Sequence, residues 1–335
     1  MKTSDFDYNL PEELIAQEPA KERDLSRLLV MDRDTGAIEH RLFRDIKDYL
    51  RPGDLLVFND TKVTAKRLMG RKSTGAEVEA LLMTRITDRV WEAMVRPARR
   101  LQPGTLVEFD CGLVGAMGED TSEGKIITFD RNADEIIETL GETPLPPYIH
   151  KKPDDPGRYQ TVYALREGSA AAPTAGLHFT KSLLKEIKDM GVDSAYVTLT
   201  VGIGTFRPVR AENIADHDMH SEVYEITPEN AEKINNPRGR VICVGTTSTR
   251  ALESAAVAKG RVEPCKTSTK LFVYPPYDFK IADCMITNFH IPKSTLLMLV
   301  SAFAGTDHIR AAYEEAVRER YRFLSFGDAM FLKRE

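Results

Sequence analysis

A single histidine follows a run of small residues in the middle of the chain. Residues Ala170 to Thr180 read Ala-Ala-Ala-Pro-Thr-Ala-Gly-Leu-His-Phe-Thr, with His178 near the end and Thr174 as the first hydroxyl. A backbone with so few side chains allows a ligand to approach closely. Histidine is the side chain that exchanges protons near neutral pH. The pattern predicts a catalytic His178; the alternative is a tight connection whose histidine makes structural hydrogen bonds.

A second group of reactive side chains lies between Asp216 and Glu222, where two histidines and three carboxylates occur within seven residues. Their spacing does not match the HExxH pattern of zinc enzymes, so we predict no metal site. A proton relay or recognition of a base fits these residue types, and a solvated charged loop is the alternative. His220 and Glu222 are the candidates for these roles.

Two turns that follow strand-like segments are suited to close contact with a ligand. The turn from Val201 to Pro208 has two glycines but lacks the third glycine of a dinucleotide fingerprint. The turn from Gly245 to Arg250 carries four hydroxyls before a helix, whose free N–H groups attract anions. A structural bulge and ordinary N-capping are the respective alternatives. The predicted substrate-binding residues of these turns are Gly202, Gly204, Thr205, Phe206, Thr246, Thr247, Ser248 and Arg250.

Polar residues also close a strand near the C-terminus. Asn288, Phe289 and His290 follow the apolar segment 284–287, and ligands collect at the ends of strands in α/β sheets. We expect Asn288 and Phe289 to contact the substrate and His290 to be a third proton-transfer candidate. Asp328 lies beside a glycine in a later turn, where a lone aspartate is commonly a cap.

The elements that must position these residues show two kinds of secondary-structure pattern. Short strand-like segments separated by turns run from 63 to 129, which indicates a small barrel or sandwich. Elsewhere strands alternate with helices, which indicates an α/β layer structure. The expected fold is an α/β main domain with a mixed sheet, residues 1–61 and 135–335, plus an inserted small all-β barrel domain, residues 62–134. The finer expectations are a helix over 10–16, a hairpin over 27–43, a helix over 133–140 and a strand over 270–274.

Composition places the chain among ordinary globular proteins, with 42% hydrophobic and 29% charged residues. Its four cysteines lie far apart without a CxxC pair, which fits a reducing compartment. The N-terminus lacks an apolar signal core, and the most apolar run, 296–303, is too short to span a bilayer. We expect a cytoplasmic monomer without a membrane partner.

Charge is distributed unevenly along the chain. Residues 62–100 contain ten Lys or Arg against four Asp or Glu, which is a net charge of +6. Because the whole chain has a net charge of −5, the other residues together carry −11. A basic section on an acidic body is typical of local contact with phosphates. The alternative is a solvated charged face.

Several motifs follow one another in a fixed order along nearly the whole chain. They are the segments 10–17, 26–30, 53–57, 144–149, 159–163, 171–180, 219–222, 244–248, 286–290, 294–305 and 327–330. This ordered set resembles the S-adenosylmethionine:tRNA ribosyltransferase-isomerases, the QueA family of queuosine biosynthesis. Two segments depart from the family pattern: Thr200 stands where the family usually has histidine, and the segment 266–277 differs.

The resemblance implies a ribosyl transfer and isomerisation. S-adenosylmethionine would be the donor, and the acceptor would be 7-aminomethyl-7-deazaguanine (preQ1) at the wobble position of a tRNA anticodon stem-loop. The products would be epoxyqueuosine-tRNA, adenine and methionine. S-adenosylmethionine is then a consumed cosubstrate, and no further cofactor is expected. An RNA methyltransferase and a non-catalytic tRNA-binding protein are the alternatives.

The same resemblance suggests roles for the candidate residues. Removing the proton at C5′ and protonating adenine require a base and an acid, for which we take His178, His220 and His290. Phe206 and Phe289 are candidates for the sulfonium, and Glu222 and Asp328 for the Watson–Crick edge of the base. Thr246, Thr247, Ser248 and Arg250 would hold the methionine carboxylate or a phosphate. The candidates for tRNA binding are Lys66, Arg67, Arg71, Lys72, Arg96, Arg99 and Arg100.

Overall fold

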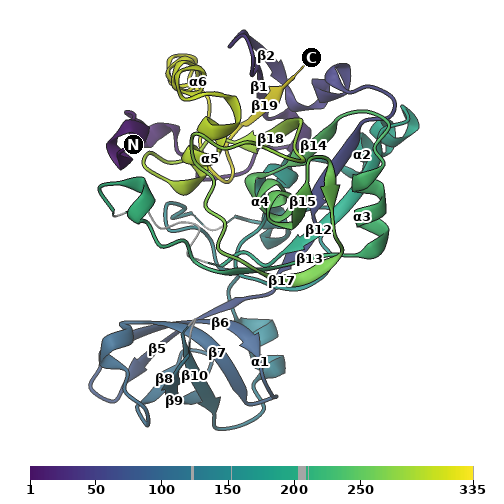
Figure 1. Ribbon diagram of the computed structural model, residues 1–335. Helices are drawn as coiled ribbons and strands as arrows, with labels where there is room; N and C mark the ends of the chain where they lie inside the picture. The colour runs from purple at the N-terminus through teal and green to yellow at the C-terminus, as the bar shows by residue number, and fades with distance from the viewer. Residues whose placement is uncertain (122–123, 152, 203–208, 210, 335) are drawn as a thin grey trace. The chain divides into compact units, whose positions relative to one another are not determined.

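The chain forms two compact units in a computed structural model that describes residues 1–121, 124–151, 153–202, 209 and 211–334 (Figure 1). The first unit comprises Met1–Thr61, Pro146–Arg166 and Ala172–Glu335, and the second comprises Lys62–Leu145 and Glu167–Ala171. The second unit is therefore an insertion in the sequence of the first. The α/β fold with an inserted β-barrel is confirmed.

A nine-stranded mixed sheet forms the centre of the first unit. In spatial order its strands are β17 (Cys265–Thr269), β13 (Glu222–Ile226), β12 (Asp193–Leu199), β3 (Leu55–Asn59), β14 (Val241–Val244), β18 (Cys284–Asn288), β19 (Ala329–Lys333), β1 (Arg27–Asp32) and β2 (Ile38–Leu42). The four strands β12, β3, β14 and β18 run parallel to one another. Their carboxyl ends therefore lie at one edge of the sheet, where the turns after β14 and β18 meet.

Five helices belong to the described residues of the first unit (Figure 1). They are α2 (Lys181–Asp189), α3 (Pro228–Asn235), α4 (Thr246–Ala255), α5 (Thr295–Ala304) and α6 (Thr306–Arg318). Side-chain caps fix where three of them begin, since the hydroxyls of Thr180, Thr227 and Ser294 accept N–H bonds from the first turns of α2, α3 and α5. α3 and α4 contact the sheet directly, α5 packs on α4, and α6 packs on α5. α4 contacts β12, β3 and β14, which places its first turn at the carboxyl edge of the parallel strands.

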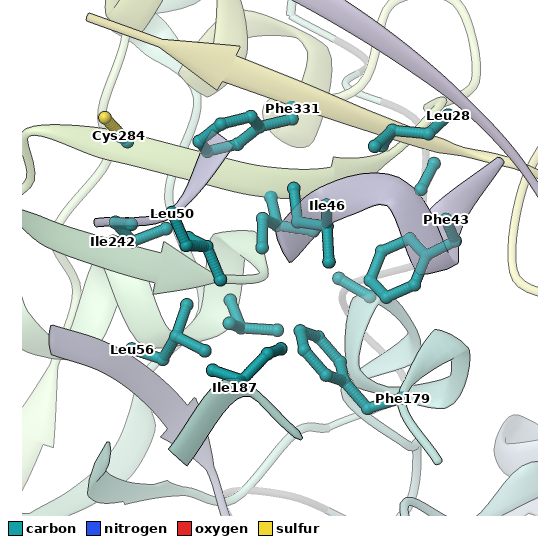
Figure 2. Close-up of a cluster of buried hydrophobic side chains, with 14 of the residues drawn as sticks. Leu28, Phe43, Ile46, Leu50, Leu56, Phe179, Ile187, Ile242, Cys284 and Phe331 are labelled. Atoms are coloured by element: carbon teal, nitrogen blue, oxygen red, sulfur yellow. The ribbon is translucent and has the colours of Figure 1, made fainter. Parts of the chain in front are cut away.

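The core of the first unit joins strands, α2 and a 3₁₀ segment, Phe43–Tyr49 (Figure 2). Phe43 and Ile46 from that segment point toward Phe179 and toward Ile187 of α2. The Phe43 and Phe179 rings meet edge to face with centroids 4.9 Å apart. Each such buried side chain stabilises the fold by about 1.5–3 kcal/mol. This packing fixes the segment that precedes α2, which contains His178.

The second unit is a closed six-stranded barrel. Around the barrel its antiparallel strands are β10 (Lys125–Phe129), β7 (Val90–Arg96), β6 (Glu77–Arg85), β5 (Lys66–Lys72), β8 (Leu106–Phe109) and β9 (Val114–Asp120). Alternating residues point inward to one apolar core, as the period of a strand requires. The remaining strands form two two-stranded sheets. One pairs β4 (Thr61–Val63) with β11 (Arg166–Ser169), and the other, in the first unit, pairs β15 (Ala256–Ala258) with β16 (Arg261–Val262).

The expected domain boundary after residue 134 is wrong. Residues 135–145 and 167–171 belong to the barrel unit. The reason is the apolar face of α1 (Asp134–Leu140), because Ile137 lies in the barrel core and Ile136 packs against it. The helix itself was expected at this position; its partner was not.

Two local expectations are also corrected. Residues 10–16 form no α-helix but a 3₁₀ turn, Glu12–Leu14, with Leu14 as its buried residue, followed by a bridge from Ile15 to Phe323. Residues 270–274 form no strand, because the chain leaves the sheet after β17 and the carbonyl of Leu271 accepts a hydrogen bond from the Arg250 side chain instead. The hairpin of β1 and β2 is confirmed.

Candidate functional site

The candidate site is a pocket of about 660 Å³, partly open to solvent, at the carboxyl ends of β14 and β18, called the large pocket below. The predicted residues among those that line it are Thr174, Thr246, Thr247, Asn288, Phe289 and His290. None of its described lining residues is Asp, Glu, Lys or Arg. The pocket therefore offers hydroxyls, an amide and apolar surface to a ligand.

Asn288 connects the small-residue segment to the end of β18. Its Oδ1 accepts a hydrogen bond from Thr174 Oγ1 at 2.9 Å. Its Nδ2 donates to the carbonyls of Leu324 and Asp328, at 3.3 and 3.4 Å, and lies 3.1 Å from Nε2 of His178. These bonds leave Asn288 with one fixed orientation at the wall of the pocket.

His178 is buried behind Asn288 and does not line the large pocket. Its Nδ1 lies 2.7 Å from Ser26 Oγ, and its ring stacks on Phe43 with centroids 4.9 Å apart. Because Nε2 faces an N–H donor of Asn288, we assign the neutral tautomer with the proton on Nδ1. Burial, together with the charges of Arg322 and Arg23, lowers the pKa of His178 to about 3. The structure thus gives this residue the structural hydrogen bonds that were the alternative to catalysis.

The turn before α4 brings backbone N–H groups to the pocket. Gly245 has φ +92°, a conformation that favours glycine, and reverses the chain from β14 into α4. The N–H groups of Thr246 and Thr247 open the helix without intrahelical partners, and Thr247 Oγ1 is buried with no hydrogen-bond partner among the described residues. Ser248 was expected to bind the ligand, but its hydroxyl donates back to the carbonyl of Val244.

The guanidinium of Arg250 bonds to other residues of the protein and is not free to bind a ligand carboxylate. Its Nη1 donates to Glu222 Oε2, and the rest of the guanidinium donates to the carbonyls of His220, Thr269 and Leu271 at 2.9–3.1 Å. The prediction that it holds the methionine carboxylate therefore needs correction. Its side chain is only 6% exposed, and that of Glu222 only 4%.

Glu222 joins Arg250 to His220. Its Oε1 lies 3.2 Å from His220 Nε2 and accepts the N–H of Gly202, also at 3.2 Å. Burial would raise the pKa of Glu222, but the hydrogen bond to His220 and the charge of Arg250 outweigh it and lower the pKa. Glu222 and Arg250 line a smaller pocket that shares Thr246 and Thr247 with the large one. Glu222 therefore places a fixed, buried carboxylate next to the part-exposed imidazole of His220.

His290 is the one predicted histidine that lines the large pocket. Its Nε2 lies 2.8 Å from Thr287 Oγ1, and its backbone N–H and carbonyl bond to the hydroxyls of Tyr313 and Tyr8. Burial lowers its pKa to about 3, so the ring is neutral near pH 7. A neutral imidazole can orient a substrate by hydrogen bonding, but it is a weak base.

Two predicted substrate-binding residues have structural roles instead. The ring of Phe289 is fully buried among Tyr313, Tyr321 and Phe323, which leaves little of it for a sulfonium. Asp328 is buried outside the large pocket, where its oxygens accept the N–H groups of Arg27 and Arg322 at 2.9 and 2.8 Å. It caps backbone, as lone aspartates in turns commonly do.

The sequence interpretation missed four polar residues of the pocket, which are Tyr148, Thr287, Ser294 and Ser325. Tyr148 and Ser325 both line it, and their hydroxyl oxygens are 2.7 Å apart. Tyr148 belongs to the proline-rich segment 144–149, whose tyrosine is its only polar side chain, and that contrast could have identified it. The predicted residues Gly204, Thr205 and Phe206 lie outside the described part of the chain.

The basic side chains of the barrel unit divide into two groups. Four of the seven predicted tRNA-binding residues lie within 4.0 Å of a carboxylate: Lys66, Arg67, Arg71 and Arg96. Lys72 donates to the carbonyl of Arg100, and no ion pair joins Arg99 or Arg100 to a described residue. The exposed charges of Arg99 and Arg100, with the half-buried Lys72, are therefore the part left for a polyanion.

Neither a metal cluster nor a membrane span emerges from the described residues. In ranges 1–121, 124–151, 153–202, 209 and 211–334, no three His, Cys, Asp or Glu side chains are grouped to hold a metal ion. None of the helices there has the length and apolar character needed to cross a bilayer.

The chain is thus a two-unit α/β protein with an inserted β-barrel and a polar, uncharged pocket at the strand ends of its α/β unit. Residues 3–332 match the family model described as queuosine biosynthesis protein. The chain belongs to this family.

Relatives with the name S-adenosylmethionine:tRNA ribosyltransferase-isomerase resemble the chain from end to end. That of Carboxydothermus hydrogenoformans is 56% identical over 99% of this chain and 100% of its own, and that of Halothermothrix orenii is 55% identical with the same shares. A crystal structure of S-adenosylmethionine tRNA ribosyltransferase from Thermotoga maritima is 40% identical and covers 98% of this chain and 100% of its own, with a TM-score of 0.56.

Proposed function

We propose that the protein transfers and isomerises the ribosyl group of S-adenosylmethionine onto preQ1 at the wobble position of tRNA. The products are epoxyqueuosine-tRNA, adenine and methionine. Family membership supports the reaction class. The carrying structural observation is the large pocket at the ends of β14 and β18, which joins the first turn of α4 to the Thr174–Asn288 pair.

The chemistry of that pocket suits the donor. Its uncharged lining accommodates an adenosine group, and the free N–H groups of Thr246 and Thr247 offer a partial positive charge to the methionine carboxylate. S-adenosylmethionine is consumed as a cosubstrate, and the reaction uses no other cofactor. The hydroxyl of Thr174 remains in the wall of the pocket, oriented by Asn288.

The three histidines take different roles in this proposal. Glu222 and His220 form the pair that can accept the proton from C5′, because the carboxylate stabilises the imidazolium that results. His290 stays neutral and orients the substrate through a hydrogen bond. His178 acts through Asn288 and is a positioning residue rather than a proton donor.

The acceptor base is presented by a single-stranded anticodon loop. A base in such a loop enters a pocket without disruption of a duplex. The tRNA backbone then contacts Lys72, Arg99 and Arg100 of the barrel unit. Phosphate contacts of this kind supply affinity but no sequence recognition.

Product analysis tests the proposed function. The purified protein is incubated with S-adenosylmethionine and tRNA that carries preQ1, and the small molecules and the digested tRNA are identified by mass. Adenine, methionine and an epoxyqueuosine nucleoside in equal amounts are expected. S-adenosylhomocysteine with a methylated nucleoside would establish the methyltransferase instead, and binding without any product would indicate a tRNA-binding protein.

Neutralisation of Arg99 and Arg100 together should weaken tRNA binding and its dependence on salt. Removal of one phosphate contact lowers the slope of log K against log salt by about 1, so the double variant Arg99→Gln/Arg100→Gln should lower it by about 2. Fluorescence anisotropy with labelled tRNA over a range of KCl concentrations measures both quantities.

Arg71→Gln is the matched control for this double variant. Arg71 is equally part of the barrel, but its guanidinium pairs with Glu77 at 2.9 Å, so its removal should change the salt slope less. An unchanged slope in the double variant would contradict the assigned tRNA contact.

A further inference from the structure

Two arginines line a second pocket of the first unit, about 270 Å³ in volume. Arg23 and Arg158 contribute its charge, and Ser26, His178 and Ser325 are among its other lining residues. Unlike the large pocket, this one is cationic, since no Asp or Glu occurs among its described lining residues. None of the roles assigned above uses it.

The hydrogen bonds of both arginines end on backbone carbonyls. Arg23 makes three such bonds, to Leu177, Gly157 and Gln160, and Arg158 makes two, to Lys21 and Ala20. A guanidinium has five N–H donors, so two on Arg23 and three on Arg158 have no hydrogen-bond partner in the described part of the chain. Nε of Arg158 is itself buried without a partner. Carbonyls orient these cations but do not neutralise them.

The positive charge of this region acts on its neighbours. The Arg322 guanidinium lies 3.5 Å from Asp328, a carboxylate that also accepts two backbone N–H groups. After burial, the charges of Arg322 and Arg23 are the causes that lower the pKa of His178. Burial and then the charge of Arg158 likewise lower the pKa of Arg23. The charge of Asp155 acts on Arg23 in the opposite direction, but its effect is smaller than that of Arg158. No Asp or Glu is among the described lining residues, so the two like charges favour an anion in the pocket.

The cationic pocket adjoins the large one. Ser325 lines both, and its hydroxyl lies 2.7 Å from that of Tyr148 in the large pocket. A nucleotide has the same layout as these two pockets, with an uncharged base next to a charged phosphodiester. The planar guanidinium forks match the paired oxygens of a phosphate.

We propose that Arg23 and Arg158 bind a backbone phosphate of the tRNA adjacent to the nucleotide whose base enters the large pocket. This inference rests on the proposed function, because it takes tRNA as the substrate. It assigns the methionine carboxylate to the N–H groups of α4 and leaves the cationic pocket to the RNA.

Removal of one charge tests the site. The variant Arg158→Gln should bind preQ1-tRNA about tenfold more weakly at 0.1 M KCl, with a salt slope lower by about 1 and an unchanged Kd for S-adenosylmethionine. Arg44→Gln is the matched control, since Arg44 is an exposed arginine of the same unit that does not line the pocket. Arg158→Lys keeps the charge and should recover most of the slope.

A modified RNA provides a second measurement that needs no change in the protein. The phosphates that flank the wobble nucleotide are replaced one at a time by uncharged methylphosphonates in a synthetic anticodon stem-loop that carries preQ1. One replacement should weaken binding to the wild-type protein at least tenfold. It should weaken binding to Arg158→Gln clearly less, because that variant has already lost one of the two guanidinium contacts and keeps only that of Arg23.

The outcomes separate this inference from the proposed function. Equal weakening by the methylphosphonate in the wild type and in Arg158→Gln would overturn the phosphate site. A higher Kd for S-adenosylmethionine in Arg158→Gln, with tRNA binding intact, would assign the pocket to the methionine carboxylate and overturn it as well. Failure of the wild-type protein to bind preQ1-tRNA at all would refute the proposed function itself.

Discussion

Replacement of Arg250 by methionine should lower the free energy of unfolding of the α/β unit by about 3–5 kcal/mol. The change removes the partner of Glu222 and leaves a carboxylate with a 4% exposed side chain without its cation. It also removes the donors to the carbonyls of His220, Thr269 and Leu271. Hydrogen exchange of peptides from α4 and β13 measures the destabilisation locally, where 1.4 kcal/mol corresponds to about a tenfold faster exchange.

Three comparisons control this prediction. Lys233→Met breaks an exposed pair on α3, with Glu229 at 3.1 Å, and should change stability by less than about 0.5 kcal/mol. The double variant Arg250→Met/Glu222→Gln should recover part of the stability, because no unpaired charge remains. Peptides from β6 and β7 of the barrel are the internal reference. A single variant within about 1 kcal/mol of the wild type would show that Glu222 does not depend on Arg250.

Arg250 also shows which part of the site a sequence pattern does not predict. The turn into α4 was correctly placed at the pocket, because a strand followed by glycine, hydroxyls and a helix has a local signature. The orientation of the Arg250 side chain has no local sequence signature, because it depends on Glu222 of β13, 28 residues earlier in the chain. The sequence does not distinguish the four consecutive hydroxyls, yet Ser248 donates to the carbonyl of Val244 at the end of β14, while Thr246 and Thr247 line the pocket.

The position of His178 was predictable, but its environment was not. The small residues around it suggested close approach of a ligand. They allow close packing of the segment instead, since Ala175 and Phe179 lie in the core. Its partners Ser26 and Asn288 lie 152 and 110 residues away in the sequence. The same limit explains the domain boundary, because the apolar face of α1 is visible in the sequence and the core that it joins is not.

The fold class was accessible because it depends on local patterns that agree with one another. Short alternating segments identified the barrel, and the alternation of strands and helices identified the mixed sheet. Tyr148 and Ser325 were missed because each is a lone hydroxyl in an apolar segment, and only the tertiary structure brings the two together. The part of the site that a single sequence does not predict is thus the pairs of residues that lie far apart in the chain and meet only in the fold.

The two buried neutral histidines should make the protein acid-sensitive between pH 6.5 and 5. Burial lowers the pKa of both His178 and His290 from 6.5 to about 3. In that interval the unfolded chain binds protons that the native protein does not, so the free energy of unfolding falls as the pH falls. Each histidine contributes about 1.4 kcal/mol per pH unit there, and the two together about 4 kcal/mol by pH 5.

Denaturant unfolding at pH 8, 6.5, 6, 5.5 and 5 measures this slope. His178→Gln and His290→Gln each keep one hydrogen-bonding group near the original Nε2 and should each remove about half of the slope, whereas the double variant should remove most of it. Stability at pH 8, where neither ring is protonated in either state, provides the baseline for the change in packing of each variant. Carboxylates with lowered pKa values, such as Asp54 and Glu222, contribute mainly at lower pH, which keeps this interval specific to histidine. A wild-type slope that survives in the double variant would mean that other groups take up the protons, and that His178 and His290 are not held neutral by the fold.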